Sequence, residues 1–571
     1  MTERKKILFI ERNLRNEKLG IMYLASALKS KGHHADLIQV DKEDLNERIC
    51  DYHPDFIAFS ISTGEHSHAL QIARNVKLRY GIPNIFGGPH CTFFPEIAYE
   101  PYVDFVVFGQ GEEAIIDIVE RRVKPGFVKG RIVSHPDELP FPDRDIFYQY
   151  DEFRNNPLKN IITSRACPYR CSYCFNHSFL ALTKIDNNTK QWFNRRSPEN
   201  IIAEINEIQN KYDLEKILFI DDNFLQGGKS WLNTFIELYS QKIKIPWMCS
   251  FRVNHLDKQL AKNLFTSGLI MVNYALESAD PDVQQYLLNR GHIHNADIIL
   301  AVSLFEQFGI NARMQNMIGL PLLNPLEDAF NTLQFNINHR VTDSWCSIFQ
   351  PYPRTALGQY CVDHGFISDD QLKYCAESFF HESRLNISNK QELYALQKLW
   401  YFVIEGNIPL NLVNILIRGK YSRHIGDQLQ DLRFQCSRKK LYKIDDSNSA
   451  VAINMKNRER WITNFDGSVL KETKPLIRAA LKEVNLPDRF IDILTKVEFD
   501  KSELNNIIKY IRGGQLDFQY KYTIDDETGK LKDPDISIYK RGCSNSFGND
   551  IRNMSEGHFM RDIAEVIHKL L

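Results

Sequence analysis

The sequence predicts an α/β protein of three parts: an N-terminal Rossmann-like domain, a partial (β/α)6 barrel and a mostly helical C-terminal domain. Strand and helix patterns alternate through about the first 140 residues and again from about residue 160 to 350, and helical patterns dominate beyond about residue 365. The length of 571 residues also exceeds that of one ordinary domain. We therefore expect domains at residues 1–140, 159–370 and 371–571, with a linker at residues 141–158.

The composition excludes several other classes of protein. Lys and Arg number 71 against 72 Asp and Glu, so there is no global charge to attract nucleic acid or an acidic membrane. No segment approaches the ~18 apolar residues of a membrane span, and the apolar run Ile7 to Ile10 is too short for a signal-peptide core. We expect a folded cytoplasmic protein that binds neither nucleic acid nor membrane.

The N-terminal domain is expected to be a parallel sheet with helices on both faces. Its predicted strands are residues 6–10, 35–40, 55–61, 84–87 and 104–108, separated by helical patterns such as residues 20–31 and 67–80. Ligands of such sheets bind beyond the carboxyl ends of the strands. Those ends carry small and polar residues, namely Ser60, Ser62, Thr63, Gly87, Gly88, Pro89, His90, Gly109, Gly111 and Glu112. Each glycine pair alone also fits a tight turn, but together they favour a ligand-binding edge.

A second alternation follows the Pro-rich connector Leu139 to Arg144. Its predicted strands are residues 161–164, 217–221, 247–251, 271–276, 312–318 and 344–349. Six βα repeats of this length fit a partial barrel, whose chemistry gathers at the C-terminal strand ends. A loop rich in cysteine directly follows the first of these strands.

This loop reads Cys167-x3-Cys171-x2-Cys174, with no fourth cysteine nearby, and the other eight of the eleven cysteines stand alone in the sequence. Structural zinc normally takes four protein ligands, whereas iron–sulfur clusters are held by thiolates. Three thiolates would leave one iron open to chelate a small molecule, which favours a catalytic cluster. A zinc site completed by His177 is the alternative, and chance clustering is improbable.

The loop, with Tyr173 before its last cysteine, resembles the signature of the radical S-adenosylmethionine (SAM) superfamily. Later segments resemble the successive strand ends of its subgroup with an N-terminal cobalamin-binding domain: residues 219–224, 247–252, 274–278, 317–321 and 349–355. Residues 87–96 and 109–113 are typical of the cobalamin-binding half. The resemblance covers about residues 5–370.

The resemblance implies three cofactors and places residues around them. The three cysteines would ligate a [4Fe-4S] cluster whose open iron binds SAM, and reduction would cleave SAM to a 5′-deoxyadenosyl radical. The expected SAM contacts are Tyr173 and Phe175 at the adenine, Glu277 at the ribose, Arg252 at the carboxylate, and Asp222 and Ser278 nearby. The alternatives are ordinary packing for Tyr173 and Phe175, an ion pair at the barrel rim for Glu277 and Arg252, and a helix cap for Asp222.

Cobalamin would bind the N-terminal domain without a histidine ligand to cobalt. No histidine precedes His33, and the loop from Glu11 to Gly20 lacks the D-x-H-x-x-G motif of mutase-type domains. The dimethylbenzimidazole tail would lie in the groove formed by Ser60, Ser62, Thr63, Gly87 and Gly88. The alternative is a domain that has lost cobalamin and serves as a scaffold.

The resemblance therefore implies a cobalamin-dependent radical SAM methyltransferase, which moves a methyl group from methylcobalamin to a substrate radical formed by hydrogen abstraction. It would use a small-molecule substrate and an electron donor of the flavodoxin or ferredoxin type. A non-methylating member of the subgroup, performing ring contraction, cyclisation or rearrangement, is the first alternative. A zinc-stabilised binding protein with a Rossmann-like sensor domain is the second.

The C-terminal region offers fewer signals. Helical patterns at residues 391–405 and 474–484 are expected to shape the substrate pocket, although a passive cap or a dimer face fits them equally. The basic run at residues 433–440 is expected to be a solvated face. Cys543 lies in a Gly- and Ser-rich loop, where a lone cysteine is usually a small apolar residue.

Overall fold

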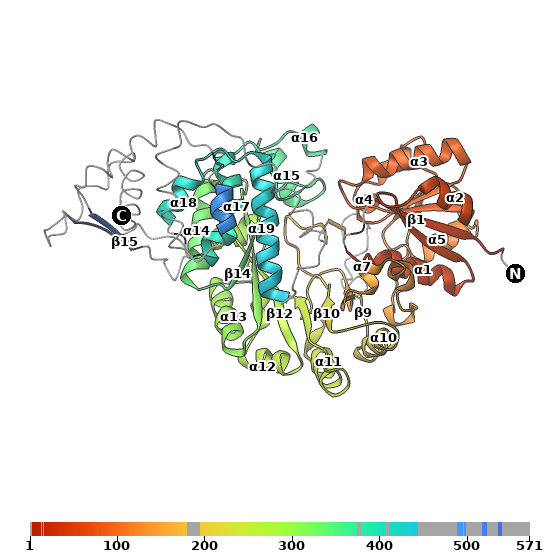
Figure 1. Cartoon of the computed structure of the whole chain (residues 1–571), viewed down its shortest axis with the longest axis horizontal. Coiled ribbons are helices and arrows are strands. Elements are labelled where there is room, and N and C mark those ends of the chain that lie inside the picture. Colours follow the sequence, from red (N-terminus) through yellow and green to blue (C-terminus); the bar gives the residue numbers. More distant parts are fainter. Residues whose placement is uncertain are drawn as a thin grey trace. The chain divides into compact units, whose positions relative to one another are not determined.

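A computed structural model of the chain describes residues 3–12, 14, 16–176, 178–179, 194–373, 378–406, 408, 410–442, 488–494, 496–497, 517–521 and 535–539. These residues form two compact units, called unit 1 and unit 2 below (Figure 1). Unit 1 lies within Met1–Val272, Pro351–Val362 and Asp369–Glu377, and unit 2 within Asn273–Gln350, Asp363–Ser368 and Ser378–Leu571. None of the described helices is long and apolar enough to cross a membrane.

Unit 1 begins with a six-stranded parallel sheet of order β2-β1-β3-β4-β5-β6. Its strands are β1 (Lys6–Glu11), β2 (His34–Gln39), β3 (Phe56–Ser60), β4 (Asn84–Gly87), β5 (Phe105–Phe108) and β6 (Gly126–Lys129). The five predicted strands are confirmed, and β6 was missed. Only Val128 is buried in this edge strand, so it carries no apolar run that a sequence pattern would detect.

Helices cover both faces of this sheet. On one face lie α1 (Leu19–Ser30) and α5 (Glu112–Val119), which pack over Ile7 and Phe9. On the other face α2 (Leu45–Tyr52), α3 (His66–Tyr80) and α4 (Pro89–Phe93) pack over Leu8 and Ile10. Successive residues of a strand point to opposite faces. Burial on both faces therefore explains the uninterrupted apolar run of β1.

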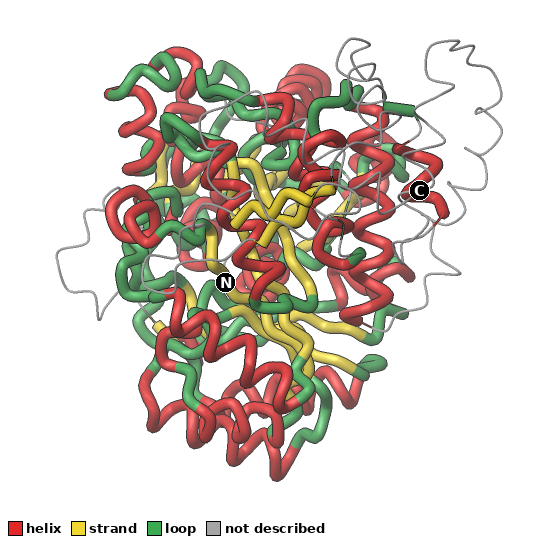
Figure 2. Tube along the Cα trace, turned by 90° about the vertical axis from the view of Figure 1, so that its left-hand side faces the viewer, coloured by secondary structure: helices red, strands yellow, loops and turns green. Residues whose placement is uncertain are grey.

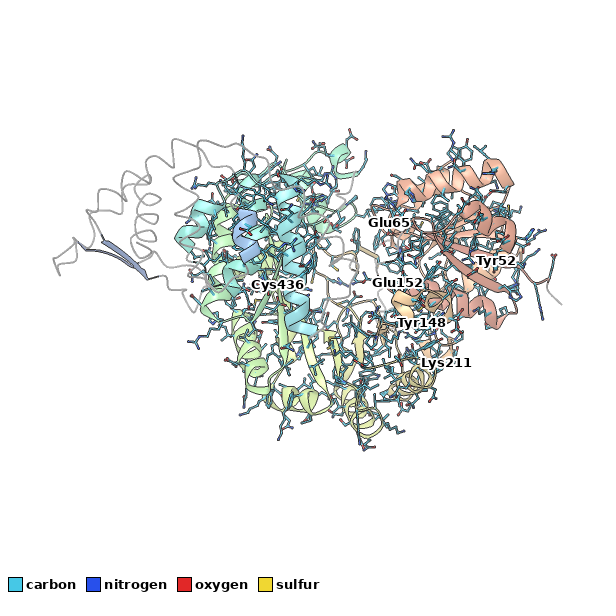
Figure 3. All side chains as sticks on the ribbon, viewed as in Figure 1. Tyr52, Glu65, Tyr148, Glu152, Lys211 and Cys436 are labelled. Atoms are coloured by element: carbon cyan, nitrogen blue, oxygen red, sulfur yellow. The ribbon has the colours of Figure 1, made fainter. Side chains whose placement is uncertain are left out.

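The segment predicted as a linker is packed into unit 1. It forms the short helices α6 (Asp145–Tyr148) and α7 (Asp151–Arg154), and Phe147, Tyr148 and Phe153 are buried in the same core as α1 (Figure 3 labels Tyr148). Arg144 donates to Glu204 Oε1 at 2.7 Å and to the carbonyl of Asn160 at 2.8 Å. These contacts hold the segment against the start of the second sheet.

The second sheet has the order β14-β13-β12-β11-β10-β7. Its strands are β7 (Leu158–Ile161), β10 (Lys216–Phe219), β11 (Trp247–Ser250), β12 (Leu269–Glu277), β13 (Asn311–Ile318) and β14 (Asp343–Ile348). The first four residues of β12 belong to unit 1 and the rest to unit 2. Helices connect the strands: α10 (Pro198–Lys211), α11 (Gly228–Lys242), α12 (Lys258–Thr266), α13 (Asn295–Phe308) and α14 (Pro325–Asn338). Figure 2 colours the strands yellow and the helices red.

Five of the six predicted strands of the barrel are confirmed, but the first, predicted at residues 161–164, shares only Ile161 with β7. β7 stops at Ile161, and Ser164–Arg165 (β8) instead pairs antiparallel with Asn194–Arg195 (β9). The side chains of Thr163 and Ser164 both donate to Asp221 at the end of β10. Polar contacts to a neighbouring strand end thus replace the expected continuation of β7.

In unit 2 the C-terminal helices share one core with the barrel. They are α17 (Lys390–Glu405), α18 (Leu410–Leu416), α19 (Arg423–Tyr442) and α22 (Asp488–Leu494). The predicted helix at residues 391–405 is confirmed as α17, which is buried almost all round against α14 and β14. A hairpin of β15 (Asp517–Lys521) and β16 (Asp535–Tyr539) was not predicted. The predicted helix 474–484 and Cys543 lie outside the described residues.

Candidate active site and cofactor cavity

The cysteine loop of unit 1 is partly buried and none of its cysteines forms a disulfide. Cys171 is buried and Cys167 and Cys174 are half-buried, and the loop turns back so that Cys174 N donates to Cys171 O at 3.1 Å. Burial raises the pKa of Cys167 to about 11 and that of Cys174 to about 12. These two thiols remain protonated near neutrality unless a metal displaces their protons, as ligation requires.

Arg252, at the end of β11, lies directly beside this loop. Its Nη1 is 3.4 Å from Cys171 Sγ, and its guanidinium lies 3.8 Å from the centre of the Tyr169 ring. Its Nε and Nη2 are buried and have no hydrogen-bond partner among the described residues. Buried polar groups are almost always paired. A free guanidinium edge next to three thiols fits a cluster whose bound ligand presents a carboxylate.

Asp221 forms hydrogen bonds with the residues that precede the cysteine loop. It is 2% exposed and accepts hydrogen bonds from Thr163 N at 3.0 Å and Thr163 Oγ1 at 2.6 Å, and from Ser164 Oγ. Gln226 Nε2 donates to the carbonyl of Ala166, at 2.9 Å, just before the first cysteine. Asp221 therefore joins two strand ends and positions the loop. Asp222 is exposed, and its expected contact with SAM stays a prediction.

Phe175, directly after the last cysteine of the loop, packs in an aromatic group. Its ring centre is 4.3 Å from that of Phe93 on α4 and 4.9 Å from that of Tyr352. Leu357 N donates to Ser172 O at 2.9 Å. The segment after the sixth barrel strand and the N-terminal domain thus both contact the loop. The expected contacts of Tyr173 and Phe175 with adenine stay predictions.

Glu277 and Ser278 belong to unit 2, where β12 ends. Glu277 has φ of +68°, an unusual value for a residue with a side chain, and its carboxylate lies 3.9 Å from Arg290 Nη1. Backbone strain of this kind occurs most often at functional sites. Ser278 is fully buried, and its hydroxyl donates to Asp328 Oδ1 at 2.5 Å. The Ser278 side chain therefore stabilises the protein structure through Asp328. Contact of Glu277 with the ribose of SAM stays a prediction.

The N-terminal domain contains a cavity of about 290 Å³ at the carboxyl end of its sheet. It lies beside the paired strands β1 and β3, where the strand order reverses, and open α/β sheets bind ligands at such a switch point. Seven of the predicted residues line it: Ser60, Gly87, Gly88, Pro89, Gly109, Gly111 and Glu112. Ser62, Thr63 and His90 do not line it. Sequence patterns missed Tyr23 and Ile115, which are themselves core residues of α1 and α5, and Arg165, which follows the first strand of the second sheet.

Gly87, the last residue of β4, and Gly88, which follows it, play different parts in this cavity. A Cβ on Gly88, which has φ of +91°, would lie 2.8 Å from the backbone nitrogen of Ile61. Gly88 is therefore required by the close approach of two loops. A Cβ on Gly87 would meet no protein atom closer than 3.9 Å, so its backbone borders open space. Gly87 is the one that leaves room for a ligand.

The polar end of the cavity is formed by Arg165 and Glu112. Arg165 Nη2 lies 2.5 Å from Glu112 Oε1, and the guanidinium lies 5.2 Å from the centre of the Tyr23 ring. Glu112 Oε2 is buried without a hydrogen-bond partner among the described residues. An apolar cavity with one unpaired acceptor fits an aromatic base and its attached sugar, as in the tail of cobalamin.

His90 and Thr63 lie together beside the cavity. The His90 ring stacks on His66, with ring centres 4.2 Å apart, and its Nδ1 is 3.3 Å from Thr63 Oγ1. Burial and the neighbouring His66 lower the pKa of His90 to about 4, which keeps its imidazole neutral. Ser62 N donates to Glu65 Oε2 at 2.9 Å. Cofactor contacts by these three residues stay predictions.

The loop after β1 holds an ion pair at the place where mutase-type domains carry their histidine. Lys18 Nζ lies 2.6 Å from Glu11 Oε2 and donates to the carbonyl of Ser60 at 3.4 Å. The described part of this loop offers an ammonium group, which cannot ligate cobalt while protonated.

His177, the alternative zinc ligand, lies outside the described residues. Within the described ranges, no three His, Cys, Asp or Glu side chains are grouped around a single-ion site.

Comparisons with known proteins find two family models that match successive parts of the chain. A family model described as the B12 binding domain matches residues 5–119, and one described as the radical SAM superfamily matches residues 161–334. An uncharacterized methyltransferase of Pyrococcus horikoshii is 26% identical over 61% of this chain and 79% of its own. The anaerobic magnesium-protoporphyrin IX monomethyl ester cyclase of Cereibacter sphaeroides is 24% identical over 61% of each chain.

A solved structure shares the fold. It is the radical S-adenosylmethionine methyltransferase TsrM from Kitasatospora setae, with a TM-score of 0.51 and 14% identity. The match covers 63% of this chain and 76% of that one. At this level of identity the likeness concerns the arrangement of strands and helices.

Proposed function

The chain belongs to the radical SAM superfamily, in the subgroup with a cobalamin-binding domain, and from this premise we propose that it methylates a small-molecule substrate. The observation that carries the proposal is that unit 1 contains two sites whose residues fit cofactors. One is the three-thiol loop with the unpaired Arg252 beside it, and the other is the base-sized cavity that ends at Glu112. The similarity to the Pyrococcus methyltransferase supports the same reaction.

The cofactors supply the chemistry when bound: the cluster donates the electron that cleaves SAM to a 5′-deoxyadenosyl radical, and cobalamin carries the methyl group. The protein's own residues bind and orient these groups. Cys167, Cys171 and Cys174 would hold the cluster. Arg252 would donate hydrogen bonds to the carboxylate of SAM from its unpaired Nε and Nη2. Asp221 keeps the loop in place through its three hydrogen bonds.

In the N-terminal domain the backbone of Gly87 and the polar pair of Glu112 and Arg165 would receive the tail of cobalamin. Glu277 would orient the ribose of SAM. An electron donor of the flavodoxin or ferredoxin type completes the proposal, because radical formation requires one electron from outside the chain.

The test is anaerobic reconstitution with iron, sulfide and hydroxocobalamin, followed by incubation with SAM, a reductant and candidate metabolites. We expect S-adenosylhomocysteine and 5′-deoxyadenosine to form together, with a product heavier by one methylene group. Cys171→Ala should abolish SAM cleavage, whereas Cys50→Ala, which changes an exposed cysteine, should not. 5′-Deoxyadenosine formed without S-adenosylhomocysteine would rule out methyl transfer.

A second candidate is radical cyclisation without methylation, which the similarity to the magnesium-protoporphyrin cyclase favours. The same experiment separates the two. Cyclisation consumes SAM only to 5′-deoxyadenosine and gives a product of lower hydrogen content with no added carbon.

A further inference from the structure

Arg433, on α19 of unit 2, is a buried cation without a partner. The basic run at residues 433–440 was expected to be a solvated face, and for Arg433 that expectation is wrong, because the residue is only 3% exposed. Its guanidinium lies 3.8 Å from the ring centre of Trp345, 5.2 Å from that of Phe434 and 5.7 Å from that of Phe380. No described residue forms a hydrogen bond or an ion pair with it.

The neighbouring charges do not neutralise Arg433. Asp343, the carboxylate whose charge acts on Arg433, accepts from Arg313 Nε at 3.0 Å and from Ser437 Oγ at 3.2 Å. Lys398 is 2% exposed and donates to the carbonyl of Phe380 at 2.7 Å. Arg313 and Lys398 thus add positive charge near Arg433, and Asp427 adds negative charge near Lys398. Burial and Arg313 lower the pKa of Arg433 to about 10, so it still carries its charge at neutral pH.

The cluster lies on the inner face of the second sheet. Ser344 on β14 accepts from Trp400 Nε1 of α17 at 2.8 Å, which places Ser344 on the outer, helix-covered face. Because strand residues alternate between faces, Trp345 and its register partner Gln315 point the other way. Gln315 is exposed, so solvent reaches this face.

We propose that Arg433, stacked on Trp345, binds an acidic group of the substrate, a carboxylate or a phosphate. Stacking on the indole leaves the N–H groups at the guanidinium edge free, and these pair with the two oxygens of such a group. The three aromatic rings provide an apolar surface next to it. The substrate class is therefore an acid with an apolar body. Only its assignment as the substrate rests on the proposed function; the anion site itself does not.

The test uses the full chain, reconstituted anaerobically, and three probes of similar size: benzoate, phenyl phosphate and the neutral benzamide. Thermal unfolding is followed at increasing probe concentration. We expect benzoate, phenyl phosphate or both to raise Tm in a saturable manner, and the responding probe identifies the acid. Benzamide should have no such effect.

Variants show whether Arg433 is responsible. Arg433→Met should weaken the response at least tenfold, Arg433→Lys should weaken it less, and Arg423→Gln, at an exposed arginine of the same helix, should leave it unchanged. Without a probe, Arg433→Met should not lower Tm, because it removes an unpaired buried charge. Figure 3 marks Cys436, which lies on the same helix.

A full response in Arg433→Met, an equal response to benzamide, or a lower Tm of Arg433→Met without probe would overturn the proposal. Methyl transfer is measured separately through S-adenosylhomocysteine and 5′-deoxyadenosine. Loss of anion binding and absence of methyl transfer are therefore independent outcomes.

Discussion

Replacing Arg252 by methionine should weaken SAM binding about 100-fold. Two of its donors, Nε and Nη2, are buried and unpaired, so the cost of removing them from water is already present in the free protein. Each hydrogen bond that they form to a carboxylate contributes about 1.5 kcal/mol at the low end for charged groups. Two such bonds amount to ~3 kcal/mol, and 1.4 kcal/mol corresponds to a factor of ten in Kd.

The assay is isothermal titration of SAM into the reconstituted protein under anaerobic conditions. Arg252→Lys is the matched variant, since it retains the charge but has no planar pair of donors, and we expect it to recover only part of the affinity. The iron content of both variants must equal that of the wild type. An Arg252→Met protein with intact iron content and unchanged SAM affinity would refute the assignment of Arg252 to the carboxylate.

Two further predictions concern stability and cofactor retention. Gly88→Ala should lower the free energy of unfolding by about 1–3 kcal/mol, because residue 88 has a φ of +91° and its new Cβ would lie 2.8 Å from Ile61. Gly87→Ala should leave the free energy of unfolding nearly unchanged and reduce cobalamin retention. Urea unfolding and cobalamin absorbance after gel filtration measure the two effects, and equal destabilisation by both variants would contradict them. Burial raises the pKa of Asp328 to about 7 from an ordinary value of 3.8. The folded protein therefore keeps a proton that the unfolded chain releases, and the contribution of Asp328 to stability falls as pH rises from about 4 to 7. Glu11, whose pKa burial also raises to about 7, adds a slope of the same sign. Asp328→Asn should therefore change the slope of the free energy of unfolding against pH without removing it, and equal slopes for the variant and the wild type in urea unfolding would contradict the assignment.

The strands most visible in the sequence are those buried on both faces. β1 is an apolar run because Ile7 and Phe9 enter one core while Leu8 and Ile10 enter another. The sequence pattern does not predict β6, because this edge strand has one buried residue and therefore no apolar run. The segment at residues 141–158 was interpreted as a linker from its prolines. Its burial depends on the surfaces of α1 and the first sheet, which no local pattern describes.

The sequence by itself indicated a cluster-binding cysteine loop, because Cys167, Cys171 and Cys174 lie within eight residues and their spacing is a local property. It also placed the ligand-binding edge of the first sheet, since strand ends of a parallel sheet meet at one side. Only the tertiary structure decided which polar groups lack partners. Arg252 lies 81 residues from Cys171, and Arg433 meets Trp345 from a distant helix. Whether a charge is solvated, paired or left free depends on such long-range contacts, and the unpaired donors of Arg252 and Arg433 are what support the two proposed ligands.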